Sequence, residues 1–168
     1  TMSTTLISGM LHVEASADVA APAPDVYRMI ADYHNGHPRI LPPRYFRNLQ
    51  VDEGGYGEGT VIRFDMIVFG KTIHARGRVT EPEPGRVLVE TYPDIGVVTS
   101  FVVEPLGAST SRVTIATDMP TRAGVLGRIE QAVTRSFLKR AYAAELAQLG
   151  VEAVERPVAA DRAGSKGR

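Results

Sequence analysis

The segment from residue 15 to residue 42, ASADVAAPAPDVYRMIADYHNGHPRILP, constrains the fold of this chain more than any other feature. It begins within a run from Met10 to Val19 in which apolar and polar residues alternate, as in a strand with one face in a core. Pro22 and Pro24 follow, and prolines are well tolerated in the first turn of a helix. We expect that helix to end near Gly36, and the prolines beyond it limit the next helix to about one or two turns. A strand and two short helices are therefore expected in this order.

The chain after residue 44 is expected to form strands, because its apolar residues recur with a period of two between turn residues. Six strands are predicted there: one that ends before Gly54, and five in the ranges 60–68, 72–80, 87–92, 97–104 and 112–118. With the first strand, the sequence predicts seven.

A long helix is predicted after the last strand. Pro120 is expected to end that strand, and Thr121 is a suitable N-cap. Apolar residues then recur at helical spacing over about 25 residues, at Val125, Ile129, Val133, Phe137, Ala141 and Ala144. Residues 154–168 lack this periodicity and are rich in small and charged residues, so a disordered tail is expected there. The predicted organisation is one ligand-binding domain over residues 9–153 and this C-terminal tail.

The composition argues against several classes of function. The 19 basic residues balance the 19 acidic ones, so no nucleic-acid partner is expected. Without cysteine there is no disulfide, thiolate nucleophile or Cys-bound metal. No apolar run approaches the roughly 18 residues of a membrane span, and no basic residue precedes Arg28, so neither stable membrane insertion nor a secretory leader is expected. We therefore expect a cytoplasmic protein that is a monomer or a homodimer.

Four short motifs occur in the order and spacing of a known family. Val19-Ala-Ala-Pro22 precedes the first helix, Ala31-Asp32 closes it, Gly57-Glu-Gly59-Thr60 opens the third strand, and Ala144-Glu-Leu146-Ala-Gln-Leu149 lies near the end of the long helix. Together with the order of elements, these motifs resemble the START-like, SRPBCC superfamily, and within it the bacterial polyketide cyclase/dehydrase and lipid-transport group. The resemblance implies an α+β helix-grip fold, in which a seven-stranded curved antiparallel sheet wraps around the long C-terminal helix. It also implies that a hydrophobic small molecule binds between sheet and helix, and only some members of the superfamily are catalysts.

The strand patterns agree with an internal cavity. Ile62, Phe64 and Met66 share the apolar face of the third strand. Ala75 and Gly77 lie on the apolar face of the next strand, where two small residues are expected to leave volume unfilled. The residues expected to contact a hydrophobic or aromatic ligand are Tyr33, His37, Ile62, Phe64, Met66, Ala75, Gly77, Thr91, Thr99, Phe101, Thr117, Val133, Ser136 and Phe137.

Candidates for catalysis are few. Tyr33 and His37 are expected near the cavity mouth, where an imidazole could act as general acid or base; the alternative is a capping or solvent-facing role. His34 and His37 lie three residues apart, but no third ligand is evident, so neither a metal nor another cofactor is expected. His74 and Arg76 are expected on the outer face of their strand, although a one-residue shift of register would turn both into the cavity.

The sequence leaves two functions open. One is an aromatase/cyclase-like enzyme that positions a polyketide or similar carbonyl compound for cyclisation or water loss. The other is a non-enzymatic carrier or sensor of a lipid or terpenoid-like ligand, favoured slightly because few ionisable groups are expected to face inward. Arg128, Arg135 and Lys139 share one face of the long helix, which is either solvated or able to touch an anionic membrane.

Overall fold

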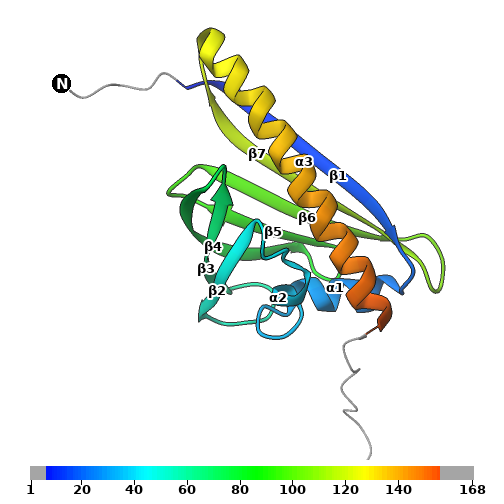
Figure 1. Cartoon of the computed structure of the whole chain (residues 1–168). Helices are drawn as coiled ribbons and strands as arrows, with labels where there is room; N and C mark the ends of the chain where they lie inside the picture. Colours follow the sequence, from blue (N-terminus) through cyan, green and yellow to red (C-terminus); the bar gives the residue numbers. More distant parts are fainter. Residues whose placement is uncertain (1–6, 156–168) are drawn as a thin grey trace, which may run out of the picture.

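One curved sheet of seven antiparallel strands forms the larger layer of the fold (Figure 1). The computed structural model describes residues 7–155. The strands are β1 (Ile7–Val19), β2 (Phe46–Glu53), β3 (Val61–Val68), β4 (Lys71–Glu83), β5 (Val87–Tyr92), β6 (Val97–Pro105) and β7 (Ser111–Arg122). Their order across the sheet is β1-β7-β6-β5-β4-β3-β2, so the first and last strands of the chain are neighbours.

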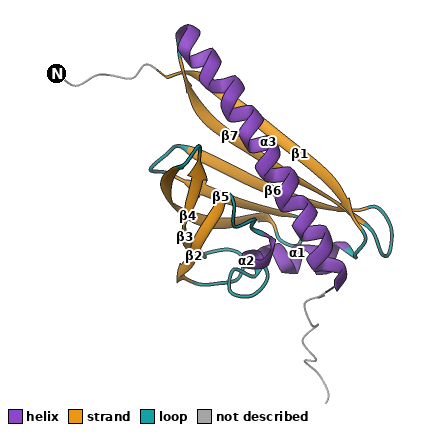
Figure 2. Cartoon of the chain, viewed as in Figure 1, coloured by secondary structure: helices purple, strands orange, loops and turns teal. Residues whose placement is uncertain are grey.

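Three helices complete the described part of the chain: α1 (Ala23–Ala31), α2 (His37–Ile40) and α3 (Gly124–Glu155). α3 lies across the sheet and packs along β1 and β7, while α1 and α2 lie beside its C-terminal half (Figures 1 and 2). The predicted helix-grip fold is confirmed, with a seven-stranded antiparallel sheet, two short helices after the first strand and one long C-terminal helix.

α1 ends at Ala31, as the Ala31-Asp32 motif indicates and before the expected end near Gly36, because Asp32 terminates it. The carboxylate of Asp32 accepts hydrogen bonds from the backbone N–H groups of His34 and Asn35, at 3.1 and 3.0 Å, and its own backbone is extended. This local arrangement competes with the helical hydrogen bonds of the next turn. Tyr33 therefore lies after α1 and not on it, and its backbone N–H bonds to the carbonyl oxygen of Gly55.

The junction between β7 and α3 also differs from the prediction. β7 does not end at Pro120 but continues to Arg122, with Pro120 opposite Met10 of β1. α3 then begins at Gly124, and its 32 residues exceed the roughly 25 expected from the apolar stripe.

The two halves of α3 pack differently. In the C-terminal half, Leu138, Ala141, Leu146 and Leu149 are buried against the sheet and the short helices. In the N-terminal half, Val125, Ile129 and Val133 belong to the predicted apolar stripe, yet their side chains are 74%, 56% and 43% exposed. This half is covered on one side by β1 and β7, which face Gly127, Glu130 and Thr134, so the apolar residues of the stripe point away from the sheet.

The predicted tail falls mostly outside the described residues, which end at residue 155, so its disorder and the domain boundary stay predictions. Within residues 7–155, no helix combines the length and apolar character needed to cross a membrane.

Candidate functional site

A cavity of about 240 Å³ lies between α3 and the inner face of the sheet. Most of its wall is apolar and is formed by Leu41, Phe46, Leu49, Ile62, Phe64, Met66, Val68, Phe69, Ile73, Ala75, Ile95, Val97, Phe101, Met119, Phe137 and Leu138. Its polar lining residues are His37, Glu90, Tyr92, Thr99, Thr117, Thr134, Tyr142 and Glu145. No lysine or arginine of residues 7–155 lines it. The cavity therefore offers an apolar ligand a largely dry wall and two carboxyl groups.

The polar groups gather at the closed end of the cavity. Glu90 of β5 lies directly opposite Thr99 of β6, and Thr99 lies opposite Thr117 of β7, so the three form a row across adjacent strands. All three side chains are buried, as is Glu145 of α3. The mouth is at the other end, where Phe69 and Ile73 line the cavity and are 69% and 39% exposed.

Many of the residues predicted to contact a ligand lie on this wall: His37, Ile62, Phe64, Met66, Ala75, Thr99, Phe101, Thr117 and Phe137. The inward faces of β3 and β4 are as expected from their alternation. Their contact with a ligand remains a prediction.

Five predicted contacts lie away from the wall. Thr91 is on the outer face of β5, because the alternation of that strand turns Leu88, Glu90 and Tyr92 inward. Val133 and Ser136 are exposed on α3, which turns Thr134, Phe137 and Leu138 towards the cavity instead. The remaining two, Tyr33 and Gly77, are buried behind cavity-lining side chains.

Gly77 does face inward, but the volume above it is filled. A Cβ atom at Gly77 would lie 2.5 Å from Cε1 of the Tyr92 ring and 2.7 Å from its Cδ1. The small residue therefore admits the Tyr92 ring and does not leave a gap for ligand. The prediction that Gly77 enlarges the cavity is wrong, whereas the neighbouring Ala75 does line it.

Glu90 is a buried carboxylate with both oxygens bonded. The Tyr33 hydroxyl donates to its Oε1 and the Tyr92 hydroxyl to its Oε2, each at 2.5 Å. Burial, followed by the charge of Glu90, raises the pKa of both tyrosines, so they remain donors at neutral pH. This pairing explains how a glutamate is accommodated on the inner face of β5.

His37 completes the cluster around Glu90. Its Nδ1 lies 2.7 Å from the backbone oxygen of Ile30, which can only accept, so Nδ1 carries a proton. Its Nε2 then points to Oε1 of Glu90 at 3.7 Å. The imidazole stacks on Tyr33 with 4.5 Å between ring centroids and meets the edge of Phe101 at 5.5 Å. Tyr33 thus positions His37 and Glu90 from behind the wall, while His37 reaches the cavity.

Glu145, unlike Glu90, has a side-chain oxygen without a hydrogen-bond partner in the described residues. Its side chain is 2% exposed and lines the cavity, and its Oε1 has no hydrogen-bond partner within the described residues. Burial, and then the negative charge of Glu90, raises the pKa of Glu145 well above its usual value. The side chain is consequently a neutral acid in an apolar space, able to donate a proton or a hydrogen bond to a bound molecule.

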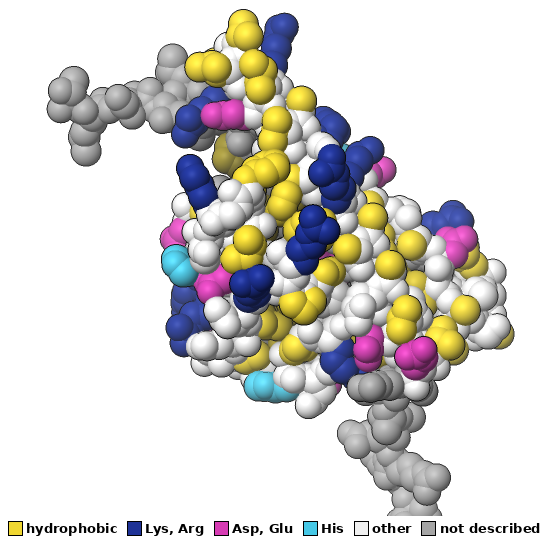
Figure 3. Space-filling view, viewed as in Figure 1, with side chains coloured by type: hydrophobic (Ala, Val, Ile, Leu, Met, Phe, Trp, Pro, Cys, Tyr) yellow, Lys and Arg dark blue, Asp and Glu magenta, His cyan; other side chains and the backbone are white. Residues whose placement is uncertain are grey.

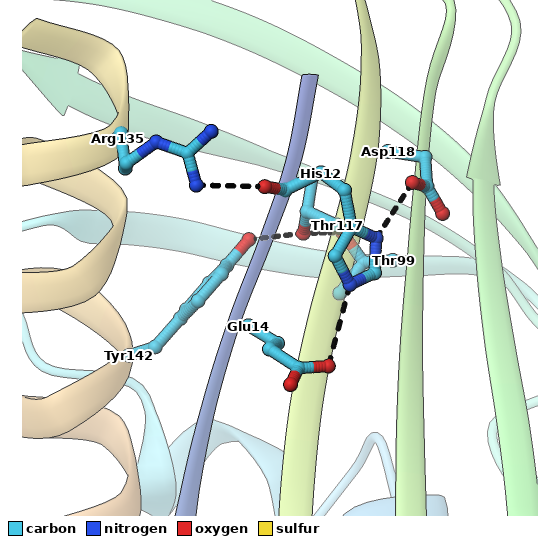
Figure 4. Close-up of polar contacts among 7 residues, drawn as sticks. All are labelled: His12, Glu14, Thr99, Thr117, Asp118, Arg135 and Tyr142. Carbon is cyan, nitrogen blue, oxygen red and sulfur yellow. Dashed lines mark hydrogen bonds and ion pairs between the residues drawn. The ribbon is translucent and has the colours of Figure 1, made fainter. Parts of the chain in front are cut away.

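Tyr142 connects α3 to the polar row. Figure 4 shows its hydroxyl directed at Thr117, which in turn is hydrogen-bonded to Thr99 at 2.8 Å. Burial raises the pKa of Tyr142 to about 12, so it stays protonated. These three hydroxyls can orient a polar group of a ligand beside Glu145.

The other polar candidates lie outside the cavity. His74 pairs with Asp65 at 2.6 Å, and Arg76 with Asp52 at 3.5 Å, on the outer face of the sheet, so the alternative register is excluded. His34 is exposed near the backbone of Gly54. No group of three metal-ligating side chains occurs among residues 7–155.

A further histidine lies on the outer sheet face. His12 of β1 bonds through Nδ1 to Asp118 at 2.8 Å and through Nε2 to Glu14 at 3.3 Å (Figure 4). Hydrogen bonds to these two carboxylates raise the pKa of His12. The group is solvent-exposed and on the opposite side of the sheet from the cavity, so it takes no part in the candidate site.

Sequence reasoning missed Glu90, Tyr92, Tyr142 and Glu145. The available signal was weak: Leu88 and Tyr92 flank Glu90 at a spacing of two, and Leu138, Tyr142, Glu145 and Leu149 recur at helical spacing.

Solved structures with the same fold include enzymes. The chain is 26% identical to the Zhui aromatase/cyclase from Streptomyces sp. R1128, with a TM-score of 0.71 over 88% of this chain and 96% of that one. The KanY protein is 24% identical over 86% of this chain and 98% of its own, with a TM-score of 0.75. A START superfamily protein from Mycobacterium smegmatis is 16% identical over 83% and 97%, with a TM-score of 0.67.

The family comparison covers nearly the whole described chain. A comparison with curated proteins finds no match. The family model described as polyketide cyclase / dehydrase and lipid transport, however, matches residues 10–153. The chain shares its fold with that START superfamily protein and with the aromatase/cyclase, and it belongs to the polyketide cyclase / dehydrase and lipid transport family.

Proposed function

We propose that this protein binds an uncharged, apolar carbonyl compound in the cavity and catalyses its cyclisation or dehydration by proton transfer. The observation that carries the proposal is Glu145, a buried acid without a protein partner at Oε1 that lines an apolar cavity. A raised carboxyl pKa in such a place matches a group that must hold a proton at neutral pH. The family and its aromatase/cyclase relative suggest the class of reaction.

The reaction needs one group that takes a proton and one that gives a proton. In this proposal Nε2 of His37 removes a proton from the carbon beside a ligand carbonyl, and the resulting enolate carbon attacks a second carbonyl carbon. Glu145 donates its proton to the oxygen of that second carbonyl as the carbon–carbon bond forms. For dehydration, Nε2 of His37 removes the proton beside the carbonyl, the C–O bond to the hydroxyl breaks, and Glu145 donates its proton to that hydroxyl, which leaves as water. The aromatic and aliphatic walls restrict the chain to folded conformers, which reduces the entropic barrier.

The charge of the wall supports an uncharged ligand. An anionic ligand would enter without a lysine or arginine of residues 7–155 to pair with it and would face Glu90. The sequence led us to expect few inward-facing acids and bases, but His37, Glu90 and Glu145 all line the cavity.

A second candidate, a non-enzymatic carrier, is favoured by the predominantly apolar wall. The two candidates differ in what Glu145 does: in a carrier, it would only hydrogen-bond the ligand.

Native mass spectrometry of the purified protein, followed by denaturation, should identify any co-purified compound and hence a class of test substrates. Turnover is then compared for the wild type, Glu145→Gln and the control Glu130→Gln, an exposed carboxylate on the same helix. We expect Glu145→Gln to keep ligand affinity and to lose roughly 100- to 10,000-fold in kcat. Full turnover by Glu145→Gln refutes the acid assignment, and tight binding without turnover by the wild type favours the carrier.

A further inference from the structure

Large apolar side chains project into solvent along the start of α3 and in the turn beside the cavity mouth. On the N-terminal half of α3 they are Val125, Leu126, Ile129 and Val133, from 43% to 77% exposed. Phe69, in the turn between β3 and β4, is 69% exposed. We call these five residues the apolar ridge. Figure 3 shows hydrophobic side chains running along this end of the molecule, with lysine and arginine side chains beside them.

The apolar ridge is continuous with the cavity. The Phe69 ring lies 5.7 Å, centroid to centroid, from Phe137, which is one helical turn beyond Val133. Phe69 and Phe137 also line the cavity. An apolar molecule that leaves the cavity at this end therefore meets the apolar ridge before it meets bulk water.

Positive charge accompanies the apolar ridge. Between residues 124 and 140, α3 carries four basic residues, Arg128, Arg135, Lys139 and Arg140, and one acidic residue, Glu130. Lys71 adds a cation two residues after Phe69. The whole chain has no net charge, so this excess is a local property of the mouth.

Phe69 is held in an unfavourable backbone conformation. Its φ is 48°, in the left-handed region, and Gly70 follows with φ of 75°. A two-residue hairpin turn of this kind favours asparagine or glycine at the first position, and a bulky side chain there carries a cost of about 1 kcal/mol or more. The Phe69 ring contacts Phe137 and lines the cavity, and its remaining exposed surface is available to a partner outside the folded domain.

We infer that the protein docks through the apolar ridge on an anionic lipid bilayer, with Phe69 and the start of α3 in the headgroup region. Projecting aliphatic and aromatic side chains flanked by cations are the features by which peripheral helices bind anionic membranes. Docking in this orientation places the cavity mouth against the bilayer, so that an apolar ligand passes between membrane and cavity without crossing water. The inference does not depend on whether the bound ligand then reacts.

The test is co-sedimentation with vesicles of phosphatidylcholine alone and of phosphatidylcholine mixed with phosphatidylglycerol. We expect binding to the anionic vesicles only, weakening as salt is raised. The double variant Arg128→Ser, Lys139→Ser should weaken binding to the anionic vesicles about five-fold for each charge removed. Leu126→Ser with Ile129→Ser should weaken it at least about ten-fold through lost apolar burial. The control, Val151→Ser with Val154→Ser, alters exposed valines at the other end of α3 and should bind as the wild type does.

Phe69→Asn separates docking from folding. Asparagine suits the left-handed turn, so this variant should keep or raise the melting temperature while its binding to anionic vesicles falls. No binding of the wild type to anionic vesicles overturns the inference, as does equal loss in the control. Dimerisation that Phe69→Asn abolishes, in the absence of vesicle binding, would assign the apolar ridge to a second copy instead. Binding to an acidic protein in preference to the vesicles would likewise overturn it.

Discussion

Replacing Glu145 with glutamine should change how the stability of the protein depends on pH. In the folded state, burial and the charge of Glu90 raise the pKa of Glu145 well above its ordinary value of 4.5. Below that ordinary value, the carboxyl is protonated in both folded and unfolded chains and contributes no pH dependence. Above it, the unfolded chain releases the proton while the folded protein retains it, so the folded state becomes less stable as pH rises.

The magnitude follows from one proton. Each pH unit over which Glu145 is protonated only in the folded state lowers the free energy of unfolding by about 1.4 kcal/mol. Between about pH 5 and about pH 7 this loss accumulates for as long as the folded protein keeps the proton, against a total stability of roughly 5–15 kcal/mol for a typical domain. A glutamine amide is neutral at every pH and close in shape, so Glu145→Gln should match the wild type at low pH and exceed its stability increasingly as pH rises.

Urea unfolding followed by far-UV circular dichroism over this pH range measures the difference. Other titrating groups affect both proteins and largely cancel, which isolates Glu145. Glu130→Gln, at an exposed site on the same helix, should show no such divergence. If the stability of Glu145→Gln runs parallel to that of the wild type at all pH values, Glu145 is ionised in the cavity and the proposed acid is wrong.

Three further substitutions test the cavity and its supports. Tyr33→Phe removes a donor from Oε1 of Glu90 and should lower the free energy of unfolding by about 1–3 kcal/mol. The control Tyr56→Phe, at an exposed site, should not lower it. If both variants are equally stable, the buried hydrogen bond does not contribute as we expect. Gly77→Ala drives a Cβ into the Tyr92 ring and should cost about 1–3 kcal/mol in urea unfolding; a neutral effect would mean that the ring moves freely. The leucine side chain of Ala75→Leu extends into the cavity, so this variant should take up less of an apolar dye in a fluorescence titration. It should also lose less stability than Gly77→Ala. Unchanged dye uptake would place the ligand elsewhere.

The sequence predicts the fold and the apolar part of the wall because both depend on local periodicity. Alternation along β3 and β4 correctly turns Phe64 and Ala75 inward, and the same rule turns His74 and Arg76 outward. The register is then enforced across the β3–β4 hairpin, where a shift by one residue would bury charged side chains.

The polar end of the cavity was not predictable in the same way. On β5, one face carries Leu88, Glu90 and Tyr92, and the other carries valines and Thr91, so both faces are largely apolar. Because a glutamate is expected to face solvent, its presence predicts that the face of Glu90 is the outer one, which is wrong. What makes Glu90 acceptable inside is Tyr33, which lies 57 positions earlier in the chain. A single-strand pattern does not contain that information.

The exposed start of α3 shows that helical periodicity cannot by itself predict burial. Its apolar residues have the spacing of a buried face, but periodicity alone cannot tell which side of the helix β1 and β7 cover. The same pattern therefore indicates burial at Leu138 and an exposed ridge at Ile129.

The contrast between the two buried carboxyls is the strongest argument that the cavity evolved for chemistry or recognition and not for stability alone. A core can usually replace buried ionised groups with apolar residues at no loss of stability, so a cluster of Glu90, His37 and two tyrosines is not explained by packing. Both oxygens of Glu90 are occupied by tyrosine hydroxyls, whereas Oε1 of Glu145 is left without a partner in the described residues and faces the cavity. Two carboxyl groups whose surroundings favour different protonation states can serve separate roles in a reaction. Burial, and then the charge of Glu90, raises the pKa of Glu145, whose side chain lines the cavity and in the proposed reaction faces the ligand.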